Sequence, residues 1–221
     1  MTGNAAPIRV AMVEDHTLFR SMLEKVLEDD PRIRLTCSTD TVTSARAQIP
    51  PGSTDVVLLD IDLPDGNGIA LGVLLCRADP KLKVVLLSAQ DAMDLMLDLP
   101  RDIAGSWSYL SKTSTNDSAA LLRAIHIAAE GGSTLDPALL NRMSPRAGSR
   151  VAQLTDRQYS VLRLLASGLS NAGIAHELTI AEKSVQNHVN AIYSTLGIDA
   201  HPERNPRVSA ALKLIEETGL S

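Results

Sequence analysis

Short apolar runs alternate with stretches of helical period through the first 130 residues of the chain. The runs read IRVAMV, IRLTC, VVLLD, VVLLS and SYL, and each gap between them has room for a helix. Continuous apolar runs of this length are typical of strands buried on both faces, and their alternation with helices predicts a parallel sheet. The pattern therefore predicts a doubly wound α/β domain with five parallel strands over residues 7–130.

The helices of this region are predicted from apolar residues that recur at spacings of one, three and four. We expect one buried stripe on the first helix, made of Leu18, Phe19, Met22, Leu23, Val26 and Leu27. The last helix of the domain repeats the pattern with Leu121, Leu122, Ile125 and Ala129.

Residues 131–150 break both periodicities. The stretch GGSTLDPALLNRMSPRAGSR is rich in glycine, serine, proline and arginine, which predicts a linker. Within it Asp136 and Pro137 could start one short helix, because proline suits the first helical position after a capping aspartate.

Residues 151–221 show only helical patterns and predict a small all-α domain. The first helix opens with the capping-box spacing of Thr155 and Gln158, and the second begins at Ser170. The third ends at Gly197, and the fourth follows Pro206. Only a few residues join the second and third helices, which is typical of a helix-turn-helix. The inward face of the third helix is predicted to hold Val185, Val189, Ile192 and Leu196.

Composition fits two globular domains, with 44% hydrophobic and 21% charged residues in 221. No apolar run approaches the roughly 18 residues of a membrane span, so we expect a cytoplasmic protein without membrane contact. Cys37 and Cys76 are isolated in sequence, which favours packing over a disulfide or a zinc site. The net charge of −5 comes from residues 1–149, with 14 basic and 19 acidic residues, while residues 150–221 hold 7 of each. A neutral C-terminal half is unusual for a DNA-binding domain.

Polar side chains follow the apolar runs at the ends of the predicted strands. Glu14 and Asp15 follow the first run, Asp60 and Ser88 end later ones, and Lys112 follows the last. Parallel strands bring their carboxyl ends to one sheet edge, so these groups should converge there rather than stay separate solvated loop residues. Clustered carboxylates repel one another unless a hard cation lies among them, which predicts bound Mg²⁺ or Mn²⁺. Metal, ammonium and hydroxyl together suit a carboxylate that attacks phosphorus.

The stretches VEDH, VVLLDIDLPDGNG, VVLLSAQ and YLSK resemble the signature of receiver domains over about residues 8–130. The resemblance implies a flavodoxin-like fold in which Asp60 accepts a phosphoryl group from a sensor histidine kinase. It implies no enzyme activity beyond this phosphotransfer and autodephosphorylation. The implied metal-binding residues are Glu14, Asp15, Asp60 and Asp62; the implied phosphoryl contacts are Ser88 and Lys112; the switch aromatic is Tyr109; and the residues that tune the acyl phosphate's lifetime are Asp62 and Gln90.

The chain departs from the receiver pattern near the fifth predicted strand. Trp107 and Ser108 stand where the family usually has a variable residue and a glycine, and Pro100 interrupts the expected fourth helix. These departures bear on the activated dimer face rather than on the phosphorylation chemistry.

Residues 154–198 resemble the LuxR-type helix-turn-helix, which makes the chain similar to response regulators of the NarL/FixJ class. The resemblance implies double-stranded DNA as a partner and a homodimer when phosphorylated. Ala172, Gly173 and Gln186 replace customary charged residues, and Ala181 replaces a customary serine cap. Either Thr179 caps the third helix instead, or that helix begins loosely.

The outward face of the third helix is the candidate DNA-reading face. Its amides can read adenine, but they release no counterions, so phosphate contact must come from Lys183, Arg204, Arg207 or elsewhere. The candidate DNA contacts are Lys183, Ser184, Gln186, Asn187, His188 and Asn190, with Ser194 on the same face.

The function expected from these patterns is phosphorylation-dependent regulation of transcription by a two-component system. One alternative is a receiver whose helical domain binds a partner protein in place of DNA. A second alternative takes Asp60 and Asp62 as the catalytic pair of a haloacid-dehalogenase-like phosphatase. That family places the pair after its first strand, whereas here the pair follows a later one.

Overall fold

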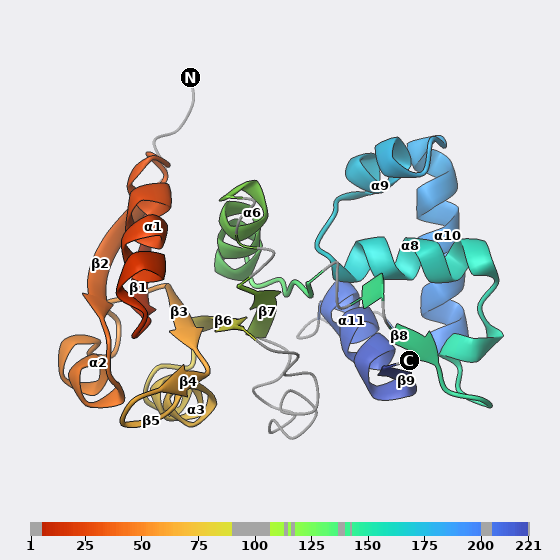
Figure 1. Cartoon of the computed structure of the whole chain (residues 1–221). Coiled ribbons are helices and arrows are strands. Elements are labelled where there is room, and N and C mark those ends of the chain that lie inside the picture. Colours follow the sequence, from red (N-terminus) through yellow and green to blue (C-terminus); the bar gives the residue numbers. More distant parts are fainter. Residues whose placement is uncertain are drawn as a thin grey trace. The chain divides into compact units, whose positions relative to one another are not determined.

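The computed structural model describes residues 6–89, 107–112, 115, 118–136, 140–141, 143–199 and 205–220 (Figure 1). They form two compact units, the first ending at Gly131 and the second beginning at Gly132. None of the described helices has the length and apolar content that crossing a bilayer requires.

The first unit is built on a five-stranded parallel sheet with the order β2-β1-β3-β6-β7. Its strands are β1 (Ile8–Val13), β2 (Ile33–Thr39), β3 (Val56–Asp60), β6 (Lys83–Ser88) and β7 (Trp107–Ser111). This order confirms the predicted doubly wound sheet. The register pairs Asp60 with Leu87 and Ser88 with Ser111, so the polar strand ends lie at one edge.

Helices cover both faces of the sheet: α1 (Thr17–Glu28), α2 (Val42–Gln48), α3 (Gly68–Ala78) and α6 (Ser118–Ala129). One core joins α1 and α6 to the side chains of one face, including Val10, Leu58 and Leu110. The predicted stripe on α1 is wrong at Leu18, whose side chain is 79% exposed. At about 100° per residue, Leu18 lies nearly opposite the fully buried Leu23 and Leu27.

Trp107 packs on the other face of the sheet, because alternate residues of a strand point to opposite sides. A Cβ atom on Gly72 of α3 would lie 2.6 Å from the indole ring, so the glycine leaves the space that Trp107 fills. Ser108, in the place of the customary glycine, is fully buried. Cys76 and Cys37 are buried free thiols, in agreement with a packing role. Pro100 lies outside the described residues.

In the part of the second unit that the structure describes, four α-helices with defined bounds pack together with a short 3-10 helix at Val151–Gln153. The α-helices are α8 (Asp156–Ala166), α9 (Asn171–Glu177), α10 (Glu182–Leu196) and α11 (Pro206–Glu217). Thr155 and Gln158 form the predicted capping box, and Gly197 ends α10 in the left-handed conformation. The predicted inward residues of α10 are all buried. In Figure 1, α9 lies across one end of α10.

The structure differs from the sequence prediction in the segment expected to be a linker. Met143–Pro145 forms strand β8, which pairs antiparallel with β9 (Thr218–Leu220), although no strand was expected after residue 131. Leu135 donates its amide to Ala166 of α8, and the Tyr159 hydroxyl donates to the Met143 carbonyl. The described part of residues 132–150 therefore packs on the second unit, because its buried apolar side chains outweigh its loop-like composition. Leu140 donates to the Asp136 carbonyl with helical spacing, while residues 137–139 lie outside the description.

Candidate functional site

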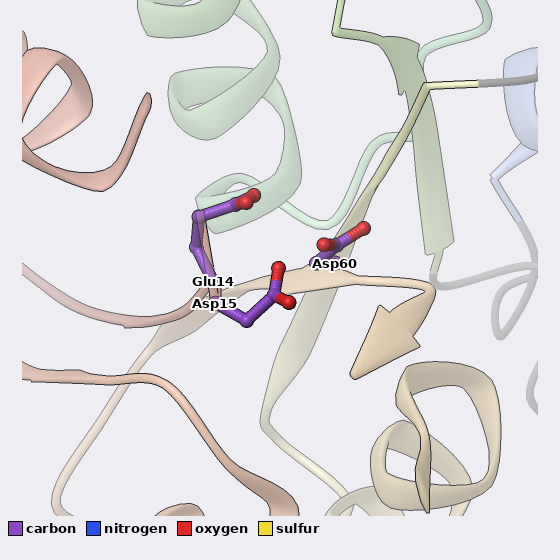
Figure 2. Close-up of side chains that lie close together, drawn as sticks. All are labelled: Glu14, Asp15 and Asp60. Carbon is purple, nitrogen blue, oxygen red and sulfur yellow. The ribbon is translucent and has the colours of Figure 1, made fainter. Parts of the chain in front are cut away.

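Three carboxylates meet at the carboxyl edge of the sheet (Figure 2). Glu14 and Asp15 follow β1 and Asp60 ends β3, and each offers an oxygen within 4.8 Å of the others. Glu14 and Asp60 are buried, whereas Asp15 is exposed. The predicted convergence is thus present in the fold. One oxygen of Glu14, Oε2, is buried and has no hydrogen-bond partner among the described residues.

Lys112 joins this cluster from the segment that follows β7. Its Nζ lies 2.8 Å from Glu14 Oε1 and 2.8 Å from Asp60 Oδ2, and it sits 5.1 Å from the centre of the Phe19 ring. The backbone amide of Lys112 donates to the Ser88 carbonyl at 2.7 Å, which places the lysine beside the end of β6. One ammonium therefore contacts two of the three carboxylates and offsets only one negative charge.

Burial and mutual repulsion make the charged forms of this cluster costly. Burial raises the pKa of Glu14 and of Asp60, and the neighbouring carboxylates raise both pKa values further, against the opposite effect of Lys112. Burial lowers the pKa of Lys112, but its hydrogen bonds to Asp60 and Glu14 outweigh that effect and leave the pKa raised. The site holds excess negative charge that a cation would stabilise.

The loop after Asp60 is fixed by close backbone packing. A Cβ atom on Gly68 would overlap the carbonyl oxygen of Asp60, and the Gly68 amide donates to Ile61 at 2.9 Å. Strands β4 (Asp62–Leu63) and β5 (Gly66–Asn67) form a hairpin that leaves Asp62 exposed. Asp65 accepts hydrogen bonds from Val42 and Thr43, so it ties the hairpin to the start of α2. Only a glycine at position 68 allows this path.

Two further residues hold the acidic pair in place. His16 caps α1 by accepting a hydrogen bond from the Phe19 amide, and its own backbone amide donates to Glu14 Oε1 at 3.1 Å. Arg20 donates to the backbone carbonyl of Glu14 at 2.6 Å. Sequence patterns did not indicate the contact of Arg20 or that of Phe19 with Lys112. One signal was available, because both residues lie in the first turn of α1, which directly follows the acidic pair.

The remaining predicted receiver residues lie at the same edge or close to it. Ser88 is buried at the end of β6, and Tyr109 is buried in β7 opposite Leu86. Gln90 lies outside the described residues.

The predicted DNA-reading residues share the solvent side of α10. Lys183, Gln186, Asn187 and Asn190 are exposed, and Ser184 and His188 are half-buried. Arg207, expected to be free for a phosphate, already donates from its guanidinium to Asn171 and Leu169. Arg204 lies outside the described residues. The structure thus leaves Lys183 as the basic side chain exposed on the described part of this face.

The start of α10 lacks a side-chain cap. Ala181 has the extended N-cap conformation but offers no side-chain acceptor. Thr179 does not cap the helix in its place; it adopts a positive φ of 52° in the turn. Arg157 of α8 donates to the Leu178 carbonyl at 3.0 Å and fastens this turn. The helix start is therefore held by its neighbours rather than by its own first residue.

Comparison with known families agrees with the geometry of both units. The receiver domain of response regulators matches residues 10–126, and the luxR family of bacterial regulatory proteins matches residues 152–203. The chain is a response regulator of a two-component system. It combines a receiver domain with a LuxR-type DNA-binding domain, as the NarL/FixJ class does, and its function is the regulation of transcription.

Relatives of the same layout extend over nearly the whole chain. The DNA-binding transcriptional activator DevR/DosR of Mycobacterium tuberculosis is 33% identical over 198 residues, which cover 87% of this chain and 89% of that protein. The nitrate/nitrite response regulator protein NarP of Escherichia coli is 29% identical over 220 residues, covering 97% and 98%. These relatives give no support to a dehalogenase-like phosphatase.

Solved structures show the same combination of folds. The response regulator ChrA of a heme-sensing two-component system has a TM-score of 0.51 with 29% identity, over 96% of this chain and 98% of that one. RcsB of Salmonella typhimurium has a TM-score of 0.53 with 18% identity over the same shares, which supports the fold alone.

Proposed function

We propose that Asp60 of this response regulator accepts a phosphoryl group from the phosphohistidine of a sensor kinase. The observation that carries the proposal is the buried Asp60 carboxylate, held at 2.8 Å by Lys112 at the sheet edge. A carboxylate oxygen of Asp60 would bond to phosphorus as the phosphorus–nitrogen bond of the donor breaks, and the imidazole would leave with the electron pair. The product is an acyl phosphate on Asp60.

The donor set fits Mg²⁺, or Mn²⁺, as the cation of this site. Three carboxylates lie within 4.8 Å of one another, and the unpartnered Oε2 of Glu14 is a buried acceptor beside them. Glu14, Asp15 and Asp60 would hold the ion with the help of Asp62. When bound, the metal neutralises charge on the phosphoryl oxygens.

Lys112 and Ser88 would receive the remaining phosphoryl oxygens. Lys112 is an ammonium already in contact with Asp60, and Ser88 ends the strand beside it. Such a contact would draw Lys112 from its present partners toward the new charge. Tyr109, buried in the strand next to Ser88, would rotate as the switch aromatic when these contacts form. Asp62 and Gln90 would set the lifetime of the acyl phosphate.

Mass spectrometry with acetyl phosphate and Mg²⁺ tests the phosphorylation site. We expect one base-labile phosphoryl adduct, its loss in Asp60→Ala, and its retention in Glu28→Ala, since Glu28 is an exposed carboxylate at the end of α1 and lies outside the cluster. An adduct that persists in Asp60→Ala would contradict the assignment.

We also propose that phosphorylation favours a homodimer whose two α10 helices enter adjacent major grooves, and that the protein acts in the cytoplasm. The candidate contacts are those on the exposed side of α10, with Lys183 and backbone amides toward phosphate. Binding of two helices compensates for the absence of a net positive charge on each, since Glu182 offsets Lys183 in α10. Beryllofluoride with Mg²⁺ should increase both oligomer size and DNA affinity. No change in either quantity would contradict the phosphorylation switch, and stable capture of a partner protein without DNA binding would favour the protein-interaction alternative.

A further inference from the structure

A chain of side-chain hydrogen bonds runs across three helices of the second unit to the exposed side of α10. Arg207 Nη1 on α11 donates to Asn171 Oδ1 on α9 at 3.0 Å, and Asn171 Nδ2 donates to Gln186 Oε1 on α10 at 2.7 Å. Gln186 Nε2 then donates to Asn190 Oδ1 at 2.9 Å. Gln186 and Asn190, the last two residues of this hydrogen-bond chain, lie on the candidate DNA-reading face.

Arg207 sets the donor-to-acceptor direction of these hydrogen bonds. A guanidinium has five donors and no acceptor, so Asn171 must turn its oxygen toward Arg207 and its nitrogen toward Gln186. The same rule then orients the amide of Gln186 and after it the amide of Asn190. Reversing any one carboxamide would bring two N–H groups face to face. Arg207 thereby fixes orientations that a free carboxamide could exchange.

The fixed orientation decides what α10 offers to a base. The oxygen of Asn190 is turned toward Gln186, and within the described part of the chain nothing accepts from its Nδ2. One acceptor position of the Asn190 oxygen is therefore taken, and the two N–H donors of its Nδ2 are the groups at this end that are left wholly unpaired within the described residues. A free asparagine pairs with adenine by using its oxygen and nitrogen together, whereas donors alone suit the adjacent N7 and O6 acceptors of guanine.

Arg207 is well placed for this positioning role. It is half-buried, its second nitrogen donates to the Leu169 carbonyl before α9, and the Asn205 side chain accepts from its backbone amide at 2.9 Å. Its guanidinium is therefore held by a second acceptor besides Asn171. A positively charged residue that would otherwise seek a phosphate is used here inside the domain.

We propose that Arg207 is a positioning residue for base selection, which acts through Asn171 and Gln186 so that Asn190 reads guanine rather than adenine. The inference rests on the proposed entry of α10 into the major groove. It names the class of base edge, two adjacent hydrogen-bond acceptors, that the amide face of this helix recognises.

Three substitutions at the Arg207 end of the hydrogen-bond chain separate donor polarity from charge and packing. Arg207→Lys keeps a group that only donates, so the amide order and the guanine preference should persist. Arg207→Gln places a carboxamide at this position, which can either donate to or accept from Asn171, so the orientations of the three amides should no longer be fixed. Asn171→Asp keeps a partner for Arg207, but its carboxylate can only accept, so Gln186 must turn its nitrogen toward it. The oxygen of Asn190 then becomes available, and adenine should replace guanine.

The experiment is selection of binding sites from random double-stranded oligonucleotides by the full-length protein with beryllofluoride and Mg²⁺. Asn190→Ala identifies the base pair that this residue reads, and Gln153→Ala, an exposed amide of the 3-10 helix that belongs neither to the hydrogen-bond chain nor to the reading face, should leave that pair unchanged. At that pair we expect guanine over adenine by about fivefold or more in the wild type and in Arg207→Lys. We expect less than about twofold in Arg207→Gln and a preference for adenine in Asn171→Asp. Matching unfolding temperatures of the variants show that the domain is intact.

The outcomes distinguish this inference from the proposed function. Enriched sites with the same guanine preference in Arg207→Gln and Asn171→Asp would overturn the positioning role while leaving DNA binding in place. A wild-type preference for adenine at the Asn190 pair would overturn it as well. A wild type that enriches no sequence would overturn the proposed DNA reading and this inference together.

Discussion

At the scale of single residues, Glu14 shows how much of the receiver site is built against local stability. Its carboxylate is fully buried, one oxygen has no partner, and burial raises its pKa. A group whose folded-state pKa is raised destabilises the fold once it is ionised. The ionised Glu14 carboxylate therefore destabilises the metal-free fold, and a bound cation would offset that free-energy cost.

We expect Glu14→Gln to stabilise the metal-free protein at pH 7 by about 1 kcal/mol, because the neutral amide removes a buried charge. The stability of the wild type should fall as pH rises above the ordinary value of 4.5 and through the raised pKa, so the gap between the two proteins should widen over that interval. Thermal unfolding with a chelator at several pH values measures it. Mg²⁺ should then stabilise the wild type more than the variant.

Asp15→Asn is the matched control for this prediction, since it removes a charge from an exposed carboxylate of the same cluster. Its effect without metal should be smaller than that of Glu14→Gln. A Glu14→Gln protein less stable than the wild type at pH 7 would show that the ion pair with Lys112 outweighs the cost of burial.

At the scale of elements, the start of α10 lacks a side-chain cap that would stabilise the helix. We expect Ala181→Ser to stabilise the second unit by about 1 kcal/mol, because position 181 already has the extended N-cap conformation and a hydroxyl there can accept a backbone N–H. Chemical denaturation followed by circular dichroism measures the change.

Ala172→Ser, at the exposed second residue of α9, is the control with the same chemical change in a helix that Ser170 already caps. It should alter stability by less than about 0.5 kcal/mol. Equal effects of the two serines would mean that the first turn of α10 gains nothing from a cap.

A buried carboxylate links the turn after α1 to α6. Asp30 is 6% exposed; the guanidinium of Arg32 donates to both of its oxygens, and His126 of α6 lies 3.0 Å away. The hydrogen bonds from Arg32, aided by the one from His126, hold the pKa of Asp30 well below its usual range despite burial. This group stabilises the receiver while it is ionised.

We expect Asp30→Asn to destabilise the receiver by about 2 kcal/mol at pH 7, since it weakens two charge-assisted contacts in a buried place. A lowered folded-state pKa gives stability that is present above the unfolded value of 3.8 and is lost as pH falls below it. The difference between variant and wild type should therefore shrink below about pH 4 in urea titrations. A constant difference across that range would assign the effect to packing.

At the scale of the whole molecule, the second unit needs residues that the sequence assigned to a linker. Leu135, Leu140 and Met143 are buried. The side chain of Glu217 accepts a hydrogen bond from the Val151 amide, and the backbone carbonyl of Glu217 accepts one from the Arg146 amide. A fragment of residues 132–221 should fold and unfold cooperatively. A shorter fragment, of residues 151–221, should be less stable by about 3 kcal/mol or more, because it lacks these apolar side chains and the strand that pairs with β9. Calorimetry of the two fragments measures the difference, and equal stability would return residues 132–150 to the role of a linker.

Repeating patterns in the sequence were sufficient to predict most of the architecture. The five apolar runs, the capping box at Thr155 and the inward residues of α10 each follow from local periodicity, which does not depend on distant partners. The convergence of Glu14, Asp15, Asp60 and Lys112 was also predictable, because parallel strands place their ends at one edge whatever their order.

What the sequence alone determined about this protein is therefore its two folds and the chemistry gathered at the receiver edge, since both depend on residue type and spacing. Only the tertiary structure decided which neighbours each group meets: the indole of Trp107 in the space left by Gly72, β8 paired with β9, and Arg207 engaged by Asn171. These contacts join residues far apart in the chain through shape and hydrogen-bond direction, and no local pattern carries that information.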